Sequence, residues 1–183
     1  MSKVHITYKE VHTYVRELAT KISLSGFKPD YIIAVGTGGF IPARILKNLI
    51  DVPVMCINVS HYDGETLETE IKTIQSIHKN SPEHEAIRNK NVLIVDELDD
   101  TRSTLLHVVD LIIDLEPNEV GVGVLHNKIK EKLGEFPESI QYFYSKLVPD
   151  KWIVYPWDEP LIEEKNSPQI DYISVDELQM WRH

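Results

Sequence analysis

Short apolar runs separated by polar or glycine-containing turns predict most of the strands of this chain. Continuous apolar runs occur at residues 31–35, 52–59, 91–95 and 120–125. Runs of this length are typical of strands buried on both faces, as in a parallel sheet. Further strands are expected at residues 142–144 and 152–155, with a weaker one at 71–77.

Helical spacing of apolar positions is clearest near the N-terminus. Residues 7–25 repeat apolar side chains every three or four positions. Thr7 with Glu10 is a capping-box signal before this stretch, and Gly26 is a stop signal after it. Further helices are predicted over residues 42–49, 105–113 and 174–181.

This alternation of strands and helices predicts an α/β fold, a mostly parallel twisted sheet flanked by helices. Ligands of such sheets bind beyond the carboxyl ends of the strands. The loops at residues 36–39 and 96–104 are expected there. Residues 60–90 are polar without a strong pattern, which is typical of a mobile functional segment. A length of 183 residues favours one domain, residues 1–183.

Composition excludes several classes of protein. The net charge is −10 with histidine neutral, and a nucleic-acid-binding surface is normally basic. No apolar run is long enough to span a bilayer. Cys56 is the single cysteine, so an internal disulfide and a cysteine-based zinc cluster are excluded. We expect a cytoplasmic protein that binds neither nucleic acid nor membrane.

The most informative stretch is VLIVDELDDTRST at residues 92–104. An apolar strand ends in acids and hydroxyl residues, and a helix follows. Amides and hydroxyls at a helix N-terminus receive a phosphate well. Acids at such a place often only cap the helix. Four acids within five positions repel one another unless they hold hydroxyls, a proton or a metal ion, so we interpret this stretch as a binding site.

Two other acidic or phosphate-binding motifs do not fit this stretch. An EF-hand that began at Asp96 would need an oxygen ligand where Leu98 stands and a glycine where Thr101 stands. A Walker loop needs the string Gly-x-x-x-x-Gly-Lys-Ser/Thr, which the chain lacks.

The segment resembles the phosphoribosyl-pyrophosphate (PRPP) motif of the type I phosphoribosyltransferases, and its DDTRST form resembles the fungal hypoxanthine-guanine enzymes and their relatives more than the human type. The resemblance implies their fold. The core would cover about residues 8–135, and a small hood subdomain would be built from about residues 136–183, with or without the N-terminus. Many family members have glycine where this chain has Arg102.

The resemblance assigns roles within this motif. Asp96 and Glu97 would hold the ribose hydroxyls directly or near Mg²⁺, and Asp100 would accept the proton of purine N7. The loop around the 5′-phosphate would consist of Asp99, Asp100, Thr101, Arg102, Ser103 and Thr104.

Four further segments resemble other parts of a phosphoribosyltransferase site. The pyrophosphate loop would be Gly36, Thr37, Gly38 and Gly39, and the catalytic flap would begin at Ser60, His61 and Tyr62. Purine binding would involve Lys128 at O6, Trp152 by stacking and the carbonyl of Ile153 at the base edge. Asp158 would join Asp96 and Glu97 near the metal or the pyrophosphate.

The resemblance therefore implies a purine-salvage enzyme. It would transfer the phosphoribosyl group of PRPP to hypoxanthine, guanine or xanthine, with Mg²⁺ as cofactor. Its partners would be PRPP, a purine base and further copies of itself in a dimer or tetramer.

Three alternatives stay open at this point. A regulatory protein with the same fold would sense the ligand without turnover. A pyrimidine or orotate enzyme is disfavoured by Lys128 and the segment at residues 152–158. A Mg²⁺-dependent phosphohydrolase is disfavoured because Leu98 interrupts the usual Asp-x-Asp spacing.

Overall fold

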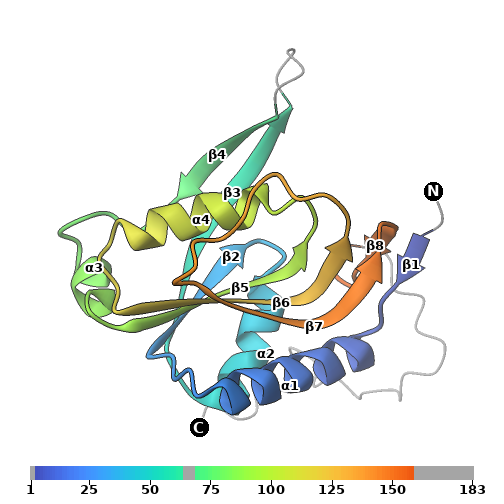
Figure 1. Cartoon of the computed structure of the whole chain (residues 1–183), viewed down its shortest axis with the longest axis horizontal. Coiled ribbons are helices and arrows are strands. Elements are labelled where there is room, and N and C mark those ends of the chain that lie inside the picture. The colour runs from blue at the N-terminus through green and yellow to red at the C-terminus, as the bar shows by residue number, and fades with distance from the viewer. Residues whose placement is uncertain (1–2, 64–68, 159–183) are drawn as a thin grey trace, which may run out of the picture.

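A computed structural model describes residues 3–63 and 69–158 (Figure 1). The strands of its main sheet are β2 (Tyr31–Gly36), β3 (Val54–Asp63), β4 (Thr69–Gln75), β5 (Asn91–Asp99), β6 (Glu119–Ile129) and β7 (Gln141–Pro149). The helices are α1 (Tyr8–Ser25), α2 (Phe40–Ile50), α3 (Pro82–Ile87) and α4 (Ser103–Ile113). The strand order is β4-β3-β2-β5-β6-β7, and every pair is parallel except β3 with β4. The predicted α/β class is confirmed.

Helices cover both faces of this sheet (Figure 1). Successive side chains of a strand point to opposite faces. Leu93 and Val95 of β5 therefore pack with α1 and α2, and Val92 and Ile94 pack with α3 and α4. This burial on both faces is why the strand is continuously apolar in sequence.

The helix α1 forms as its sequence predicts. The amide of Glu10 donates to Oγ1 of Thr7 at 3.2 Å, and the amide of Thr7 donates to Oε2 of Glu10 at 2.8 Å. Gly26 ends the helix in the left-handed region at φ 84°. The buried stripe is Val11, Val15, Leu18 and Ile22. Full burial of such a side chain contributes about 1.5–3 kcal/mol.

Several strands extend further than their apolar runs predict, among them β5 and β6. β5 continues to Asp99, although a polar loop was predicted from Asp96 onward. β6 continues to Ile129, so Lys128 lies within the strand and not after it. β5 stays paired with β6 to the register of Asp99 with Asn127, and the end of β6 pairs with β7, Lys128 with Val148 and Ile129 with Pro149. This backbone pairing does not require apolar side chains.

Three elements differ from the predicted pattern. β1 (Lys3–His5) was not predicted and pairs parallel with β8 (Trp152–Val154) in a second small sheet (Figure 1). α3 was also not predicted, although Ser81 caps it and Pro82 opens it. α2 begins at Phe40, two residues before the prediction. We propose that the hood begins with β1 and β8. Its remainder at residues 159–183, with the helix predicted at 174–181, lies outside the described residues.

In the described part of the chain, no helix is both long and apolar enough to cross a membrane.

Candidate active site

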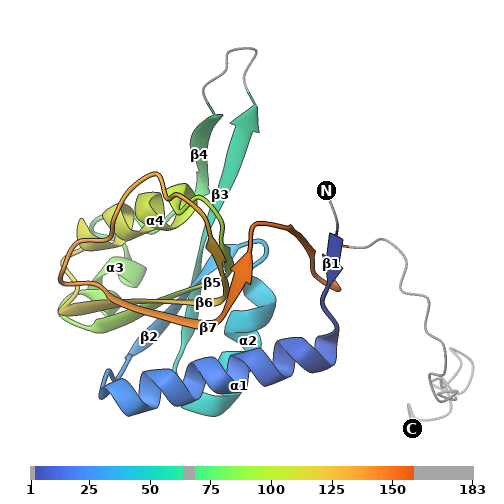
Figure 2. The same cartoon turned by 45° about the vertical axis from the view of Figure 1, so that its right-hand side comes forward.

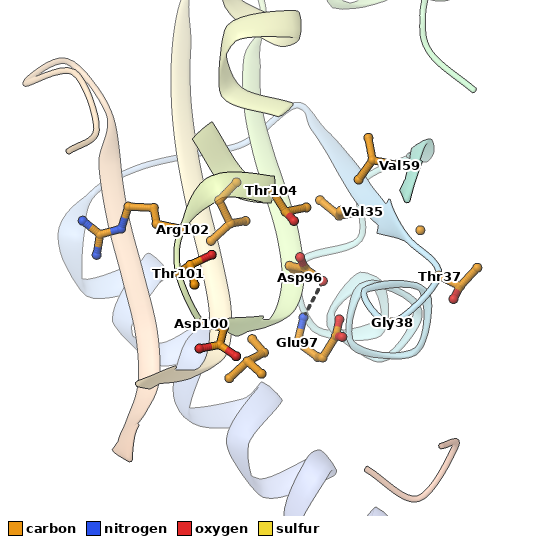
Figure 3. A pocket seen from close by; sticks show the side chains of 13 residues that line it. Val35, Thr37, Gly38, Val59, Asp96, Glu97, Asp100, Thr101, Arg102 and Thr104 are labelled. Atoms are coloured by element: carbon orange, nitrogen blue, oxygen red, sulfur yellow. Dashed lines mark hydrogen bonds between the residues drawn. The ribbon is translucent and has the colours of Figure 1, made fainter. Parts of the chain in front are cut away.

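A cavity of about 310 Å³ lies at the carboxyl ends of β2 and β5 (Figure 3). One wall consists of residues 36–38 and the other of residues 96–98, 100–102, 104 and 105, with Val35 and Val59 completing it. The two loops that the sequence places at this edge therefore meet across one cavity.

The loop at residues 36–39 joins β2 to α2 and packs tightly. The amide of Gly39 donates to the carbonyl of Val35 at 2.9 Å, and the Gly36–Thr37 peptide is cis. A Cβ atom on Gly38 would overlap the carboxylate of Glu97. A side chain at this position would therefore displace the carboxylate of Glu97 or the loop where the two walls approach each other.

The acid pair Asp96 and Glu97 lies between the loop at residues 36–39 and the turn at residues 100–104 (Figure 3). Asp96 is buried, and its Oδ1 accepts a hydrogen bond from the amide of Glu97 at 2.9 Å. Burial, and next the charge of Glu97, raise the pKa of Asp96 well above its ordinary value. Oε2 of Glu97 is buried and has no hydrogen-bond partner among the described residues. Such an oxygen is suited to receive a ligand hydroxyl or a cation.

The turn from Asp99 to Thr104 divides its side chains between two sides. Asp100, Thr101 and Thr104 line the cavity together with Arg102, whose guanidinium turns away from it to bind Asp99. Asp99 has no exposed surface and accepts hydrogen bonds from Arg102 and Tyr142, away from the cavity. Oγ of Ser103 lies 3.0 Å from Oγ1 of Thr101. The helix α4 begins at Ser103, and the amides of a helix's first turn are not used within the helix.

Asp100 belongs to a cluster of charges at the ends of β5, β6 and β7. Its Oδ2 lies 2.8 Å from Nζ of Lys128, and its Oδ1 lies 3.0 Å from Nζ of Lys130. Asp150 also pairs with both lysines, at 3.4 and 3.2 Å. Burial raises the pKa of Asp100, but the hydrogen bonds from Lys128 and Lys130 outweigh burial, and the pKa falls below its ordinary value. Asp100 is therefore ionised at neutral pH.

Residues 152–158 follow this cluster. Trp152 is 60% exposed, whereas Ile153 is buried in the core. Asp158 accepts a hydrogen bond at Oδ2 from the amide of Tyr155 at 2.9 Å. The ring of Tyr155 stacks on Trp157 at 4.8 Å. Trp152 is thus the aromatic side chain of this segment that is accessible to a ligand.

Residues 7–164 match the family model described as the phosphoribosyl transferase domain. The chain belongs to the phosphoribosyltransferase family. The resemblance inferred from the sequence is thereby confirmed.

Curated relatives of this phosphoribosyltransferase include fungal enzymes. The chain is 35% identical to a hypoxanthine-guanine phosphoribosyltransferase of Schizosaccharomyces pombe, over 90% of this chain and 93% of the relative. It is 33% identical to xanthine phosphoribosyltransferase 1 of Saccharomyces cerevisiae, over 88% of this chain and 92% of the relative.

Solved structures share the fold. A hypothetical protein of Neisseria gonorrhoeae with bound ppGpp has a TM-score of 0.81 and 40% identity, covering 87% of this chain and 90% of its own. A purine phosphoribosyltransferase of Pyrococcus horikoshii has a TM-score of 0.70 and 32% identity, covering 90% of this chain and 100% of its own.

The predicted flap of this phosphoribosyltransferase lies on β3. Ser60, His61 and Tyr62 pair in the antiparallel β3–β4 hairpin, which projects from the sheet (Figures 1 and 2). Oγ1 of Thr73 on β4 lies 2.8 Å from Nε2 of His107 on α4. The base of the hairpin thus contacts α4, the helix that follows the turn at residues 99–104. The side chains of His61 and Tyr62 lie outside the described part of the structure.

The predicted metal ligands are only partly brought together. Asp96 and Glu97 are adjacent at the cavity, whereas Asp158 binds the backbone of its own turn. No group of three or more histidine, cysteine, aspartate or glutamate side chains suited to a metal ion occurs among the residues that the structure describes.

Sequence reasoning missed a buried pair behind Glu97. The hydroxyl of Tyr155 donates to the carbonyl of Glu97 at 2.9 Å, and Nδ1 of His126 lies 2.7 Å from that hydroxyl. Because the hydroxyl proton is used by Glu97, His126 is the donor to Tyr155. Burial raises the pKa of Tyr155 well above its ordinary value, so the phenol keeps this proton. The sequence signal was weak, because Tyr155 lies in a segment that was predicted simply as a strand and His126 directly follows another.

Acidification should destabilise the fold through His126. Burial lowers the pKa of His126 from 6.5 to about 4. Between these values the unfolded state binds a proton that the folded state does not, so the free energy of unfolding falls as the pH falls. The loss should be on the order of 3 kcal/mol across this window. Urea unfolding measured between these two pH values tests this expectation.

The matched variants are His126→Gln and, as the control, His12→Gln on the exposed face of α1. His126→Gln should reduce the number of protons taken up on unfolding in this pH range by about one. His12→Gln should leave that number unchanged. Equal slopes for the wild type and His126→Gln would contradict the account.

Proposed function

We propose that this phosphoribosyltransferase acts on 6-oxopurines. It transfers the phosphoribosyl group of PRPP to hypoxanthine, guanine or xanthine and releases pyrophosphate. The observation that carries the proposal is the cavity, where the loop at residues 36–39 and the turn at residues 100–104 face each other with the acid pair Asp96 and Glu97 between them. This arrangement suits a sugar that carries hydroxyls between two phosphate groups. Relatives named for purine bases, and a neighbour that holds the purine nucleotide ppGpp, support the choice of base.

Each wall of the cavity binds one of the two phosphate-bearing ends of PRPP. The turn at residues 100–104 receives the 5′-phosphate through its amides and hydroxyls. The loop at residues 36–39 receives the pyrophosphate through closely approaching amides. Asp96 and Glu97 accept hydrogen bonds from the ribose hydroxyls.

Three residues next to the turn bind the base. Trp152 stacks on the purine ring, Lys128 donates to O6, and the carbonyl of Ile153 accepts from the base edge. The exposure of Trp152 and the position of Lys128 beside Asp100 support these roles. Lys128 can turn from Asp100 to O6 because Lys130 still pairs with that carboxylate.

The reaction forms a bond between purine N9 and C1′ of the ribose as the bond from C1′ to the pyrophosphate oxygen breaks. The proton of purine N7 passes to Asp100, which is ionised at neutral pH. Positive charge develops on the ribose ring, and the carboxylates of Asp96 and Glu97 stabilise it. The β3–β4 hairpin closes over the cavity and excludes water, which would otherwise hydrolyse PRPP.

The residues of this cavity fit Mg²⁺. The ion prefers oxygen ligands and binds through one or two carboxylates together with substrate phosphates. Asp96 and Glu97 supply the carboxylates, and the unpartnered Oε2 of Glu97 supports this role. Asp158 would join them once released from the amide of Tyr155. When bound, the ion neutralises charge on the leaving pyrophosphate.

Replacing Trp152 with alanine should raise KM for the base about tenfold or more, because base–aromatic stacking contributes about 1–3 kcal/mol. KM for PRPP should change little, since Trp152 does not line the cavity of the two loops. Trp152→Phe keeps a stacking face and should retain most of the affinity. Initial rates at varied base concentration measure the effect. Equal KM values for the wild type and Trp152→Ala would remove Trp152 from the base site.

A spectrophotometric assay with PRPP, Mg²⁺ and each of hypoxanthine, guanine and xanthine tests the proposed function. We expect a nucleoside 5′-monophosphate and one equivalent of pyrophosphate with at least one base. Binding of PRPP without release of pyrophosphate would favour a ligand-sensing protein instead. The dimer or tetramer and the cytoplasmic location stay predictions, and gel filtration tests the first.

A further inference from the structure

The turn at residues 99–104, which we call the phosphate turn, is contacted on the side away from the cavity by residues 132–136, which we call the strap. Nζ of Lys132 donates to the carbonyl oxygens of Asp99 and Asp100, at 2.8 Å each. The amide of Leu133 donates to the carbonyl of Thr101 at 3.0 Å. Three successive carbonyls of the turn are therefore drawn toward the strap.

This pinning also orients the amides of the turn. In a trans peptide the C=O and the N–H point in opposite directions. Fixing the carbonyls of Asp100 and Thr101 therefore turns the amides of Thr101 and Arg102 away from the strap. These two residues line the cavity, whereas the strap does not. The strap thus favours amides that face an anion in the cavity.

Arg102 fastens the turn to the same region. Its backbone is left-handed at φ 72°, and its side chain is largely buried and points away from Asp96 and Thr104 (Figure 3). Nε and Nη2 donate to Oδ2 of Asp99 at 3.1 and 3.0 Å.

The guanidinium of Arg102 has further partners in the strap and on β7. Nη1 donates to Glu135 of the strap at 3.0 Å. The guanidinium lies over the rings of Phe136 at 4.7 Å and Tyr142 at 5.2 Å. The hydroxyl of Tyr142 donates to the same oxygen of Asp99 at 2.7 Å. A planar fork that also stacks on rings is a geometry that lysine cannot reproduce.

We infer that Arg102 is a positioning residue, whose guanidinium locks the 5′-phosphate turn in its anion-binding shape by binding Asp99, Phe136 and Tyr142. The inference rests on the proposed function of the turn. A left-handed backbone is unfavourable for arginine and favourable for glycine. A glycine would adopt the conformation but would leave the turn free to move. The contacts of the guanidinium offset the unfavourable backbone and fix the turn before the ligand binds.

The test compares guanosine 5′-monophosphate with guanosine by isothermal titration calorimetry. The dissociation constant of guanosine divided by that of guanosine 5′-monophosphate measures how much the phosphate contributes to binding. Arg102→Gly should reduce this ratio about tenfold, because the turn is no longer preorganised. The dissociation constant of guanosine should change less than about twofold, because guanosine has no phosphate to place in the turn. Arg102→Lys should restore only part of the ratio, since lysine lacks the fork. A ratio in Arg102→Gly equal to that of the wild type would overturn the inference.

A second variant, Tyr142→Phe, tests the same inference if Arg102→Gly folds poorly. Tyr142→Phe removes only the hydroxyl that donates to Asp99 and should reduce the ratio about threefold. Tyr144→Phe, on the same strand, is the matched control and should leave the ratio unchanged. An unchanged ratio in Tyr142→Phe would also count against the inference. Failure of the proposed function is distinguishable, because the wild type itself would then show neither turnover nor preference for the monophosphate.

Discussion

Replacing Asp100 with asparagine should lower kcat by about 10²–10⁴-fold, the range typical of a lost general base. The asparagine keeps the shape of the turn but cannot accept the proton of purine N7. KM for PRPP should change much less, because the phosphate is held by the amides and hydroxyls of the turn. Initial rates at varied PRPP, with saturating base, separate the two parameters.

Asp150→Asn is the matched control for Asp100. Asp150 also pairs with Lys128 and Lys130 but does not line the cavity. Its replacement should disturb the same lysines and leave most of the turnover. If Asp100→Asn weakened PRPP binding as strongly as it lowered kcat, the role of Asp100 as proton acceptor would be wrong.

Replacing Gly38 with alanine should reduce kcat/KM for PRPP about 100-fold, because a displacement of about 1 Å in a positioned site has an effect of this size. The added Cβ would overlap the carboxylate of Glu97, so either the loop or Glu97 must move. Both lie on the surface that would hold the pyrophosphate and the ribose. Steady-state kinetics with varied PRPP, together with a thermal melt, measure the effect.

The control for Gly38 is Gly123→Ala on β6. A Cβ atom there would press on Leu18 of α1, at 3.3 Å, away from the cavity. This variant should lower the melting temperature and leave KM for PRPP unchanged. The opposite pattern in Gly38→Ala, a lower melting temperature with unchanged kinetics, would show that the loop is structural only.

The strands that could be predicted are those whose burial requires a recognisable pattern of apolar residues in the sequence. β2 and β5 are buried on both faces, so they read as continuous apolar runs. β1 left no such trace, because its three residues are exposed and it is held by backbone pairing with β8. The polar ends of β5 and β6 were missed for the same reason.

The sequence indicated which residues belong to the candidate site. It did not indicate that neighbouring side chains of the turn point to opposite sides. Asp99 and Asp100 are adjacent and both acidic, and the resemblance assigned them to one phosphate loop. Asp99 is held by Tyr142, which lies 43 residues away in the sequence, so no local pattern marks this contact. A signal did exist for the lysines that bind Asp99 and Asp100, because Lys128, Lys130 and Lys132 stand close together at alternate positions of the sequence.

A crystal structure with bound guanosine 5′-monophosphate tests the central claim most directly. The account predicts the phosphate within hydrogen-bond distance of the amides and hydroxyls of residues 101–104, with the ribose hydroxyls at Asp96 and Glu97. Density for the nucleotide at another place, with the turn after β5 unoccupied, would contradict the account.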